Sequence, residues 1–193
     1  VFFYRKEFLL QLRKLCDKLK IPIFADEILT GGGRTGKFFA YQHYEGFDPD
    51  FITFGKGLQV AGVVQVERPA PFIYRGIDRQ TTLYQYSEPL LKSAQILNRI
   101  KSDHLMENAE KSGKYLLQRL GTQLPSDISP LEKSAALRGK GLLIWGHVWY
   151  GKTMRFGDTP VPTLEFGDVT SAYGRLMPYL TLSPDEIDMI WEP

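Results

Sequence analysis

A lysine and an acidic pair each follow a short apolar run in the first third of the chain. Lys56 lies between two glycines directly after the apolar run 51–54, where a solvated lysine has little local reason to stand. Asp26 and Glu27 close an earlier apolar run, residues 21–25. Groups that follow neighbouring parallel strands meet at one edge of a sheet, where α/β folds bind their ligands. A lysine in that crevice can form a Schiff base, and an aspartate there can hold a protonated ring nitrogen.

Each of these residues also has an ordinary structural explanation. A solvated strand end accounts for Asp26 and Glu27 taken alone, and a surface amine accounts for Lys56 taken alone. Two oppositely charged groups at strand ends of one α/β unit, however, favour a functional site over two unrelated surface charges.

A glycine-rich segment, residues 31–37, matches two nucleotide-binding patterns. Its glycines fit the dinucleotide pattern G-x-G-x-x-G, and it fits a phosphate-binding P-loop up to the last position, where Phe38 replaces the hydroxyl residue. Both patterns require a helix next, and Gly46 follows too soon for one of normal length. A nucleotide-binding domain is therefore a weak alternative, and it predicts that ATP or NAD protects the chain against heat.

The elements that must position these groups are expected in the order helix, strand, turn, strand, strand. Apolar spacing and turn residues place them at 6–19, 21–25, 30–36, 51–54 and 59–65. Cys16 falls on the apolar face of the first helix and is expected in the core. This order predicts an α/β fold with a mostly parallel sheet.

The second half of the chain is less regular. We expect a helix from Pro89 to about residue 100, a second helix over 103–120 with Asp103 as its N-cap, and a strand over 141–148. Residues 121–131 form a linker, which predicts a domain boundary between residues 120 and 121. Residues 151–174 show no clear period, and Ser183-Pro-Asp-Glu186 is typical of a helix start.

The overall composition excludes several classes of protein. The chain has 193 residues, is 43% apolar and carries a formal net charge of +2, too little to predict nucleic acid or an anionic membrane as a partner. Its one cysteine fits a reducing compartment, and no apolar run approaches the roughly 20 residues of a membrane span. The first residue is not an initiator Met, so we expect the natural protein to begin upstream. The first residues do not have the pattern of a signal peptide, and we expect a cytoplasmic protein.

Residues 23–37, together with Pro49-Asp50 and Thr53-Phe-Gly-Lys-Gly57, resemble the class III pyridoxal-phosphate-dependent aminotransferases. The resemblance continues through most of the chain and is weakest between residues 147 and 172. It implies part of the fold type I architecture of pyridoxal-phosphate transferases. Residues 1–120 would be the C-terminal half of the large cofactor-binding domain, and residues 121–193 an incomplete small α+β domain.

The resemblance also implies roles for five residues. Lys56 would form the Schiff base with pyridoxal 5'-phosphate and later move the proton. Asp26 would pair with the pyridinium nitrogen, and Ile28 would pack against one face of the ring. Thr82 would donate to the cofactor phosphate of a neighbouring subunit, which implies a homodimer. Arg175 would hold a substrate carboxylate as a bidentate pair.

The implied reaction is transfer of an amino group, terminal on its donor, from an amine or amino acid to a 2-oxo acid. Residues 59–63 resemble the L-lysine 6-aminotransferase branch, so L-lysine is one candidate donor, and the sequence leaves the identity of the donor open. The chain departs from the family at Leu29, where that branch has glutamine, and at residues 84–86, where Tyr-Gln-Tyr replaces Gly-Gly-Asn. The family's N-terminal half is absent, so we expect the chain to be inactive alone; a catalytically dead, partner-binding paralogue is the alternative.

Overall fold

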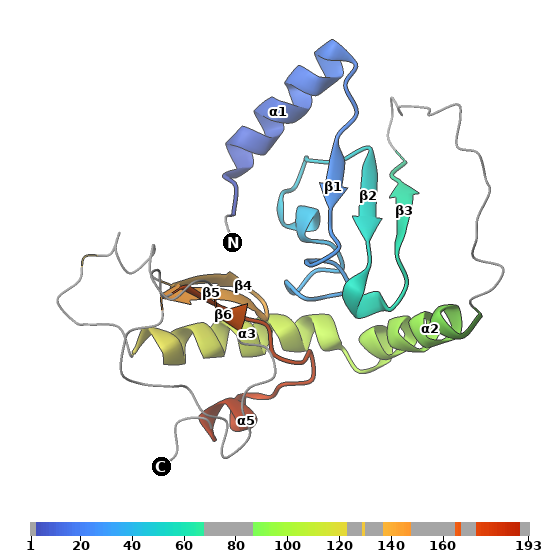
Figure 1. Ribbon diagram of the computed structural model, residues 1–193. Helices are drawn as coiled ribbons and strands as arrows, with labels where there is room; N and C mark the ends of the chain where they lie inside the picture. Colours follow the sequence, from blue (N-terminus) through green and yellow to red (C-terminus); the bar gives the residue numbers. More distant parts are fainter. Residues whose placement is uncertain are drawn as a thin grey trace. The chain divides into compact units, whose positions relative to one another are not determined.

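The computed structural model describes residues 3–67, 87–122, 129, 137–147, 165–166 and 173–189. The chain divides into two compact units (Figure 1). The amino-terminal unit comprises residues 2–32 and 37–103, and the carboxy-terminal unit comprises residues 33–36 and 104–193 with Val1. The predicted boundary at 120/121 stays a prediction, although the helix before it packs with the strands that follow it.

The amino-terminal unit is built on a three-stranded sheet in the order β1-β2-β3 (Figure 1). Strands β1 and β2 are parallel, with Asp26 opposite Thr53, and β3 is antiparallel to β2. The elements are α1 (Lys6–Leu19), β1 (Phe24–Asp26), the 3-10 helix η1 (Ala40–His43), β2 (Phe51–Phe54), the 3-10 helix η2 (Lys56–Leu58), β3 (Gly62–Gln65) and α2 (Ser87–Ser102). The mixed α/β architecture agrees with the sequence prediction.

The first strand is shorter than predicted and begins later, at Phe24 instead of residue 21. Pro22 has no N–H to give to a ladder. The next residue, Ile23, donates its N–H to the Asp50 carboxylate at 2.7 Å, and its carbonyl accepts from the backbone N–H groups of Asp50 and Phe51. Regular strand pairing therefore starts one residue further on.

Helix α1 is held to its unit by a buried charge as well as by apolar contacts. Arg13 lies on the buried face with Leu9 and Cys16, which confirms the core position predicted for the cysteine. The guanidinium donates to the Asp50 carboxylate at 2.7 Å, and both side chains are nearly inaccessible to water. A second pairing, to Asp17 at 2.9 Å, satisfies more of the guanidinium.

The carboxy-terminal unit packs two helices with a four-stranded antiparallel sheet in the order β4-β5-β7-β6. Its elements are α3 (Leu105–Gly121), β4 (Leu137–Lys140), β5 (Leu143–His147), β6 (Glu165–Phe166), β7 (Tyr173–Leu176) and α5 (Pro184–Asp188). The core joins α3, β5 and α5 through a cluster of buried apolar side chains: Ala109, Leu116, Leu120, Leu142, Ile144, Leu182 and Ile187.

Two predicted details of this unit are wrong. Asp103 is not the N-cap of α3, because the helix begins at Leu105 after His104, and the Asp103 carboxylate pairs with Arg99 at the end of α2. The strand predicted over 141–148 begins only at Leu143, because Gly141 forms the turn after β4 with a φ of 52°. The helix start at Ser183 is confirmed: its hydroxyl accepts from the N–H of Glu186.

Among the helices that the structure describes, none combines the length and the apolar character required to cross a membrane. The predicted linker lies largely outside the described residues.

Candidate active site

Lys56 is the first residue of η2, directly after β2, and its side chain is exposed. Its backbone has a φ of 43°, in the left-handed region that residues other than glycine rarely enter. Gln59, at the other end of η2, is left-handed as well, with a φ of 59°. Backbone outliers of this kind cluster at functional sites, because local strain persists only where the surrounding structure imposes it.

Asp26 ends β1 at the same edge of the sheet at which Lys56 follows β2. Its Oδ1 accepts two hydrogen bonds, from the N–H of Ile28 at 3.1 Å and from the hydroxyl of Thr53 at 3.2 Å. These bonds fix the carboxylate, and among the described residues none donates to Oδ2. An exposed carboxylate oxygen thus stays available for a ligand at this edge.

Ile28 connects the two ends of this site. A Cβ placed on Gly55, the residue before Lys56, would lie 3.4 Å from Ile28 Cγ2. Ile28 therefore lies in van der Waals range of the backbone that carries the lysine, and it remains partly exposed. The structure places Lys56, Asp26 and Ile28 at one edge of the sheet. Their roles toward a cofactor stay predictions.

Glu27, the other half of the acidic pair, has a different place. Its side chain is only 3% exposed. Its carboxylate accepts from the hydroxyl of Thr30 and from the backbone N–H groups of Ala40 and Tyr41, at 3.0 and 2.8 Å for the two amides. Glu27 therefore closes the base of the glycine-rich loop rather than facing the site. Sequence reasoning missed this role, and the one available signal was the hydroxyl of Thr30 three residues later.

The charge of Glu27 also acts on two nearby phenols. Burial raises the pKa of Tyr41, and the carboxylates of Asp48 and Glu27 raise it further. Burial is likewise the main cause that raises the pKa of Tyr44, to which Glu27 adds, while a hydrogen bond to the backbone of Tyr4 acts in the opposite direction. Both shifts favour the neutral phenols beside the buried carboxylate.

The glycine-rich loop does not form a phosphate cradle. The next element after it is the 3-10 helix η1 and not an α-helix, and the first amides of η1 donate to Glu27 instead of pointing at an open site. Its tip, residues 33–36, belongs to the carboxy-terminal unit. There the Arg34 guanidinium donates to the carbonyls of Leu142 and Pro178, and burial lowers the pKa of Arg34. This geometry gives the nucleotide-binding alternative no support.

The structure does not test the roles of the two remaining predicted residues. Arg175 lies in β7, opposite Trp145 of β5 and Glu165 of β6, within the carboxy-terminal unit. Thr82 lies outside the described residues, as do residues 84–86. Their roles therefore stay predictions.

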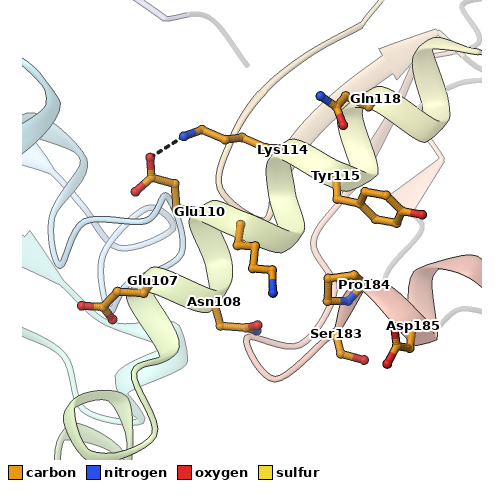
Figure 2. A pocket seen from close by; sticks show the side chains of 10 residues that line it. Glu107, Asn108, Glu110, Lys114, Tyr115, Gln118, Ser183, Pro184 and Asp185 are labelled. Atoms are coloured by element: carbon orange, nitrogen blue, oxygen red, sulfur yellow. Dashed lines mark hydrogen bonds and ion pairs between the residues drawn. The ribbon is translucent and has the colours of Figure 1, made fainter.

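A shallow groove occurs elsewhere, between α3 and α5 of the carboxy-terminal unit (Figure 2). Its walls mix acidic, basic and amide side chains, from Glu107 and Asn108 on α3 to Ser183 and Asp185 at the start of α5. The Lys114 ammonium at its rim is already paired with Glu110 at 2.8 Å (Figure 2). Of the predicted site residues that the structure describes, none lines this groove, and we assign it no role in the chemistry.

Comparison with known proteins agrees with the fold. A lysine at the carboxyl edge of an α/β sheet, with an aspartate beside it, is a combination found in enzymes that use pyridoxal phosphate. The family model described as "Aminotransferase class-III" matches residues 1–192. The chain belongs to the class III aminotransferases.

Individual relatives show the same family. The acetylornithine aminotransferase of Caldanaerobacter subterraneus is 30% identical over 190 residues, which cover 94% of this chain and 46% of the relative. The L-lysine-epsilon aminotransferase of Mycobacterium bovis is 33% identical over 144 residues, which cover 72% of this chain and 31% of the relative. The chain thus spans less than half the length of these curated relatives.

Solved structures give the same result. The ornithine aminotransferase of Plasmodium yoelii superposes with a TM-score of 0.70 at 26% identity, over 98% of this chain and 51% of that structure. The lysine aminotransferase of M. tuberculosis superposes with a TM-score of 0.68 at 27% identity, over 97% of this chain and 43% of that structure.

The residues at the sheet edge fit the cofactor of this family, pyridoxal 5'-phosphate. They supply an exposed amine at Lys56, an anchored carboxylate at Asp26 with one oxygen available, and an apolar surface at Ile28. A flat, cationic heteroaromatic ring requires these three groups: attachment, charge neutralisation and a packing face.

Proposed function

We propose that the chain supplies the lysine-bearing part of the active centre of a pyridoxal-phosphate-dependent aminotransferase. The observation that carries the proposal is the meeting of Lys56, Asp26 and Ile28 at the carboxyl edge of the β1–β2 pair. Because the chain covers less than half of its curated relatives, we propose that it does not turn over substrate by itself.

In this proposal each residue has a separate task. When bound, pyridoxal phosphate supplies an electron sink that stabilises negative charge at the substrate's α-carbon. Lys56 would hold the cofactor through Nζ and would move a proton as a base. Asp26 would keep the ring nitrogen protonated, while Thr53 and the Ile28 N–H hold its Oδ1 in place. Ile28 would pack on the ring and exclude water from one face.

The substrates follow from chemistry at the other proposed site. Arg175 would bind the carboxylate of an amino acid or 2-oxo acid in a bidentate pair. We propose a donor with a terminal amine, of which L-lysine is the specific candidate, and a 2-oxo acid as the acceptor. Relatives named for lysine, ornithine and acetylornithine support this class of donor. We further propose a cytoplasmic homodimer in which Thr82 contacts the phosphate bound by the neighbouring subunit.

Covalent trapping of the cofactor tests the role of Lys56. The purified chain is incubated with pyridoxal phosphate, reduced with borohydride and digested, and the modified peptide is identified by mass spectrometry. We expect the label on Lys56 and its loss in Lys56→Ala. Lys37→Ala is the control, since Lys37 is an exposed lysine outside the site. A label spread evenly over surface lysines, or one that persists in Lys56→Ala, contradicts the proposal.

One observation favours a second candidate function. Tyr84-Gln-Tyr86 adds bulk where the family has Gly-Gly-Asn near the cofactor phosphate, which suits a catalytically dead, partner-binding paralogue. The two candidate functions differ in the result expected with the cofactor. A catalytically dead paralogue would show no selective attachment of pyridoxal phosphate at Lys56.

A further inference from the structure

The glycine-rich loop, residues 31–37, has no task in the function proposed above, yet one of its glycines lies against the helical turn that begins at Lys56. Gly32 is buried and has a φ of 72°, in the region that favours glycine. A Cβ on Gly32 would lie 3.1 Å from Cδ2 and 3.4 Å from Cγ of Leu58. The loop backbone therefore packs directly on the side chain of Leu58, two residues after the lysine.

Leu58 is the residue that holds η2 in place. Of the three residues of this 3-10 helix, Leu58 is the buried one, at 4% exposure, while Lys56 and Gly57 are exposed. Two backbone hydrogen bonds of 3.1 and 2.8 Å, donated by Leu58 and Gln59, close the turn. A turn of this length has little stability of its own, and the left-handed backbone at Lys56 and Gln59 lowers that stability further. The burial of Leu58 therefore keeps the turn in this conformation.

The loop side of this contact is held by the strand ends that carry the site. The N–H of Glu27 donates to the carbonyl of Thr53 at 2.9 Å, which ties the residue after β1 to β2. The carbonyl of Glu27 in turn accepts from the N–H of Gly31 at 2.8 Å. A Cβ on Gly31 would lie 2.8 Å from this carbonyl oxygen and 3.3 Å from the ring of Phe39. The backbone that enters Gly32 is thus fixed to the sheet, with no room to shift toward its own anchor.

We propose that Leu58 is a positioning residue, whose packing on Gly32 sets the direction in which the Lys56 amine leaves the sheet edge. The glycine-rich loop is then the platform of the lysine turn and not a phosphate cradle. This inference rests on the role proposed for Lys56 and adds to it the contact that places the amine. The lysine nitrogen must reach the aldehyde carbon of the cofactor to form a C=N bond with loss of water. Because the reacting atoms must come within about 3–3.5 Å of each other in an aligned geometry, a small displacement of the turn slows attachment.

Two pairs of variants test this assignment. Leu58→Ala removes the side chain, and its control is Leu9→Ala, which truncates a leucine of similar burial on α1. Gly32→Ala presses a Cβ on Leu58 from the loop side alone, which separates this contact from the one that η2 also makes with α2. Its control is Gly46→Ala, at a glycine with a φ of 85° whose Cβ would have its nearest neighbour at 3.5 Å. Both glycine variants carry the strain of a positive φ, and only Gly32→Ala crowds the lysine turn.

Each variant is treated with pyridoxal phosphate and borohydride below its unfolding transition, which circular dichroism locates. The label at Lys56 is divided by the label at Lys101, an exposed lysine of α2. We expect this ratio to fall about tenfold or more in Leu58→Ala and Gly32→Ala. It should keep its wild-type value in the two controls and recover in Leu58→Met, because methionine has a similar volume. Acetic anhydride, which requires only an exposed amine, should modify Lys56 equally in every variant.

A wild-type ratio in either folded contact variant overturns the inference, as does an equal fall in Leu9→Ala or in Leu58→Met. A parallel loss of acetylation also overturns it, because the Lys56 amine would then have lost its exposure instead of its direction. If Leu58→Ala does not fold, the comparison of Gly32→Ala with Gly46→Ala decides alone. A wild-type chain without selective label at Lys56 refutes the proposed function and this inference with it, whereas a selective label that survives in the contact variants refutes only the inference.

Discussion

Replacement of Glu27 by glutamine tests how the site edge is held in place. The buried carboxylate accepts from Thr30 and from the amides of Ala40 and Tyr41. In Glu27→Gln one acceptor oxygen becomes an NH2 group, which then faces an amide donor in a buried position. Loss of one hydrogen bond to a charged group costs about 1.5–3 kcal/mol. For a chain of this size that corresponds to a fall in melting temperature of roughly 3–12 °C.

Three measurements follow this change. Circular dichroism gives the melting temperature, amide hydrogen exchange reports the N–H groups of Ala40 and Tyr41, and NMR of labelled tyrosine reports the Tyr41 phenol. We expect faster exchange at both amides and a lower pKa of Tyr41, because Glu27 is among the groups that raise it. Glu45→Gln is the matched control, since Glu45 is 95% exposed and makes only a long contact with Lys6.

The reasoning is refuted if Glu27→Gln behaves like Glu45→Gln in melting temperature and in amide exchange. An unchanged Tyr41 titration would mean that the Glu27 side chain does not act on this phenol. The sign of the pH dependence is a further check. A phenol whose pKa is raised by folding contributes stability below pH 10, and that stability is lost as the pH rises through the folded pKa. In Glu27→Gln this alkaline loss should be smaller.

Further predictions concern the anchors of the two units. Asp50→Asn should destabilise the chain by about 3–5 kcal/mol, because it leaves the buried Arg13 guanidinium without its main partner. Urea unfolding measures the free energy of unfolding, and a change below about 1 kcal/mol would contradict the prediction. Gly141→Ala should lower the melting temperature far more than the control Gly57→Ala. A Cβ on Gly141, which has a positive φ, would lie 2.5 Å from the Thr35 carbonyl carbon, whereas a Cβ on Gly57 would meet open space. Equal effects of the two substitutions would contradict this close approach. The pKa of Tyr115 is raised by its hydrogen bond to Asp188, so Asp188→Asn should lower it in an NMR titration, and an unchanged titration would exclude that bond.

The sequence predicted those elements whose signals are local. Helix α1 was found from apolar spacing and the start of α5 from its capping residues, because both signals lie within one or two turns of chain. The predicted start of α3 is wrong. Aspartate is common at N-caps, but the Asp103 carboxylate accepts a hydrogen bond from Arg99 of the preceding helix. The residue types alone do not show whether the Asp103 carboxylate caps the helix that follows or pairs with Arg99 of the helix before it.

The sequence predicted the position of those site residues that directly follow a strand. Asp26 and Lys56 follow adjacent parallel strands, so topology alone brings them to one edge. The contact of Ile28 with Gly55 and the bonds of Thr53 and Glu27 depend on loop geometry and were not predictable from spacing. The roles of Lys56, Asp26, Ile28, Thr82 and Arg175 stay predictions until cofactor binding is measured.

The left-handed backbone at Lys56 has a consequence for how this position evolves. An L-amino acid in that conformation costs the fold roughly 1–2 kcal/mol, which glycine avoids and asparagine reduces. Stability alone would therefore favour another residue in place of Lys56. The variant Lys56→Asn should match or exceed the wild-type chain in resistance to unfolding. A protein that needed only its fold for partner binding would have no physical reason to keep an amine here. Lys56 thus costs the fold stability at this position, which fits the chemical role proposed for its amine.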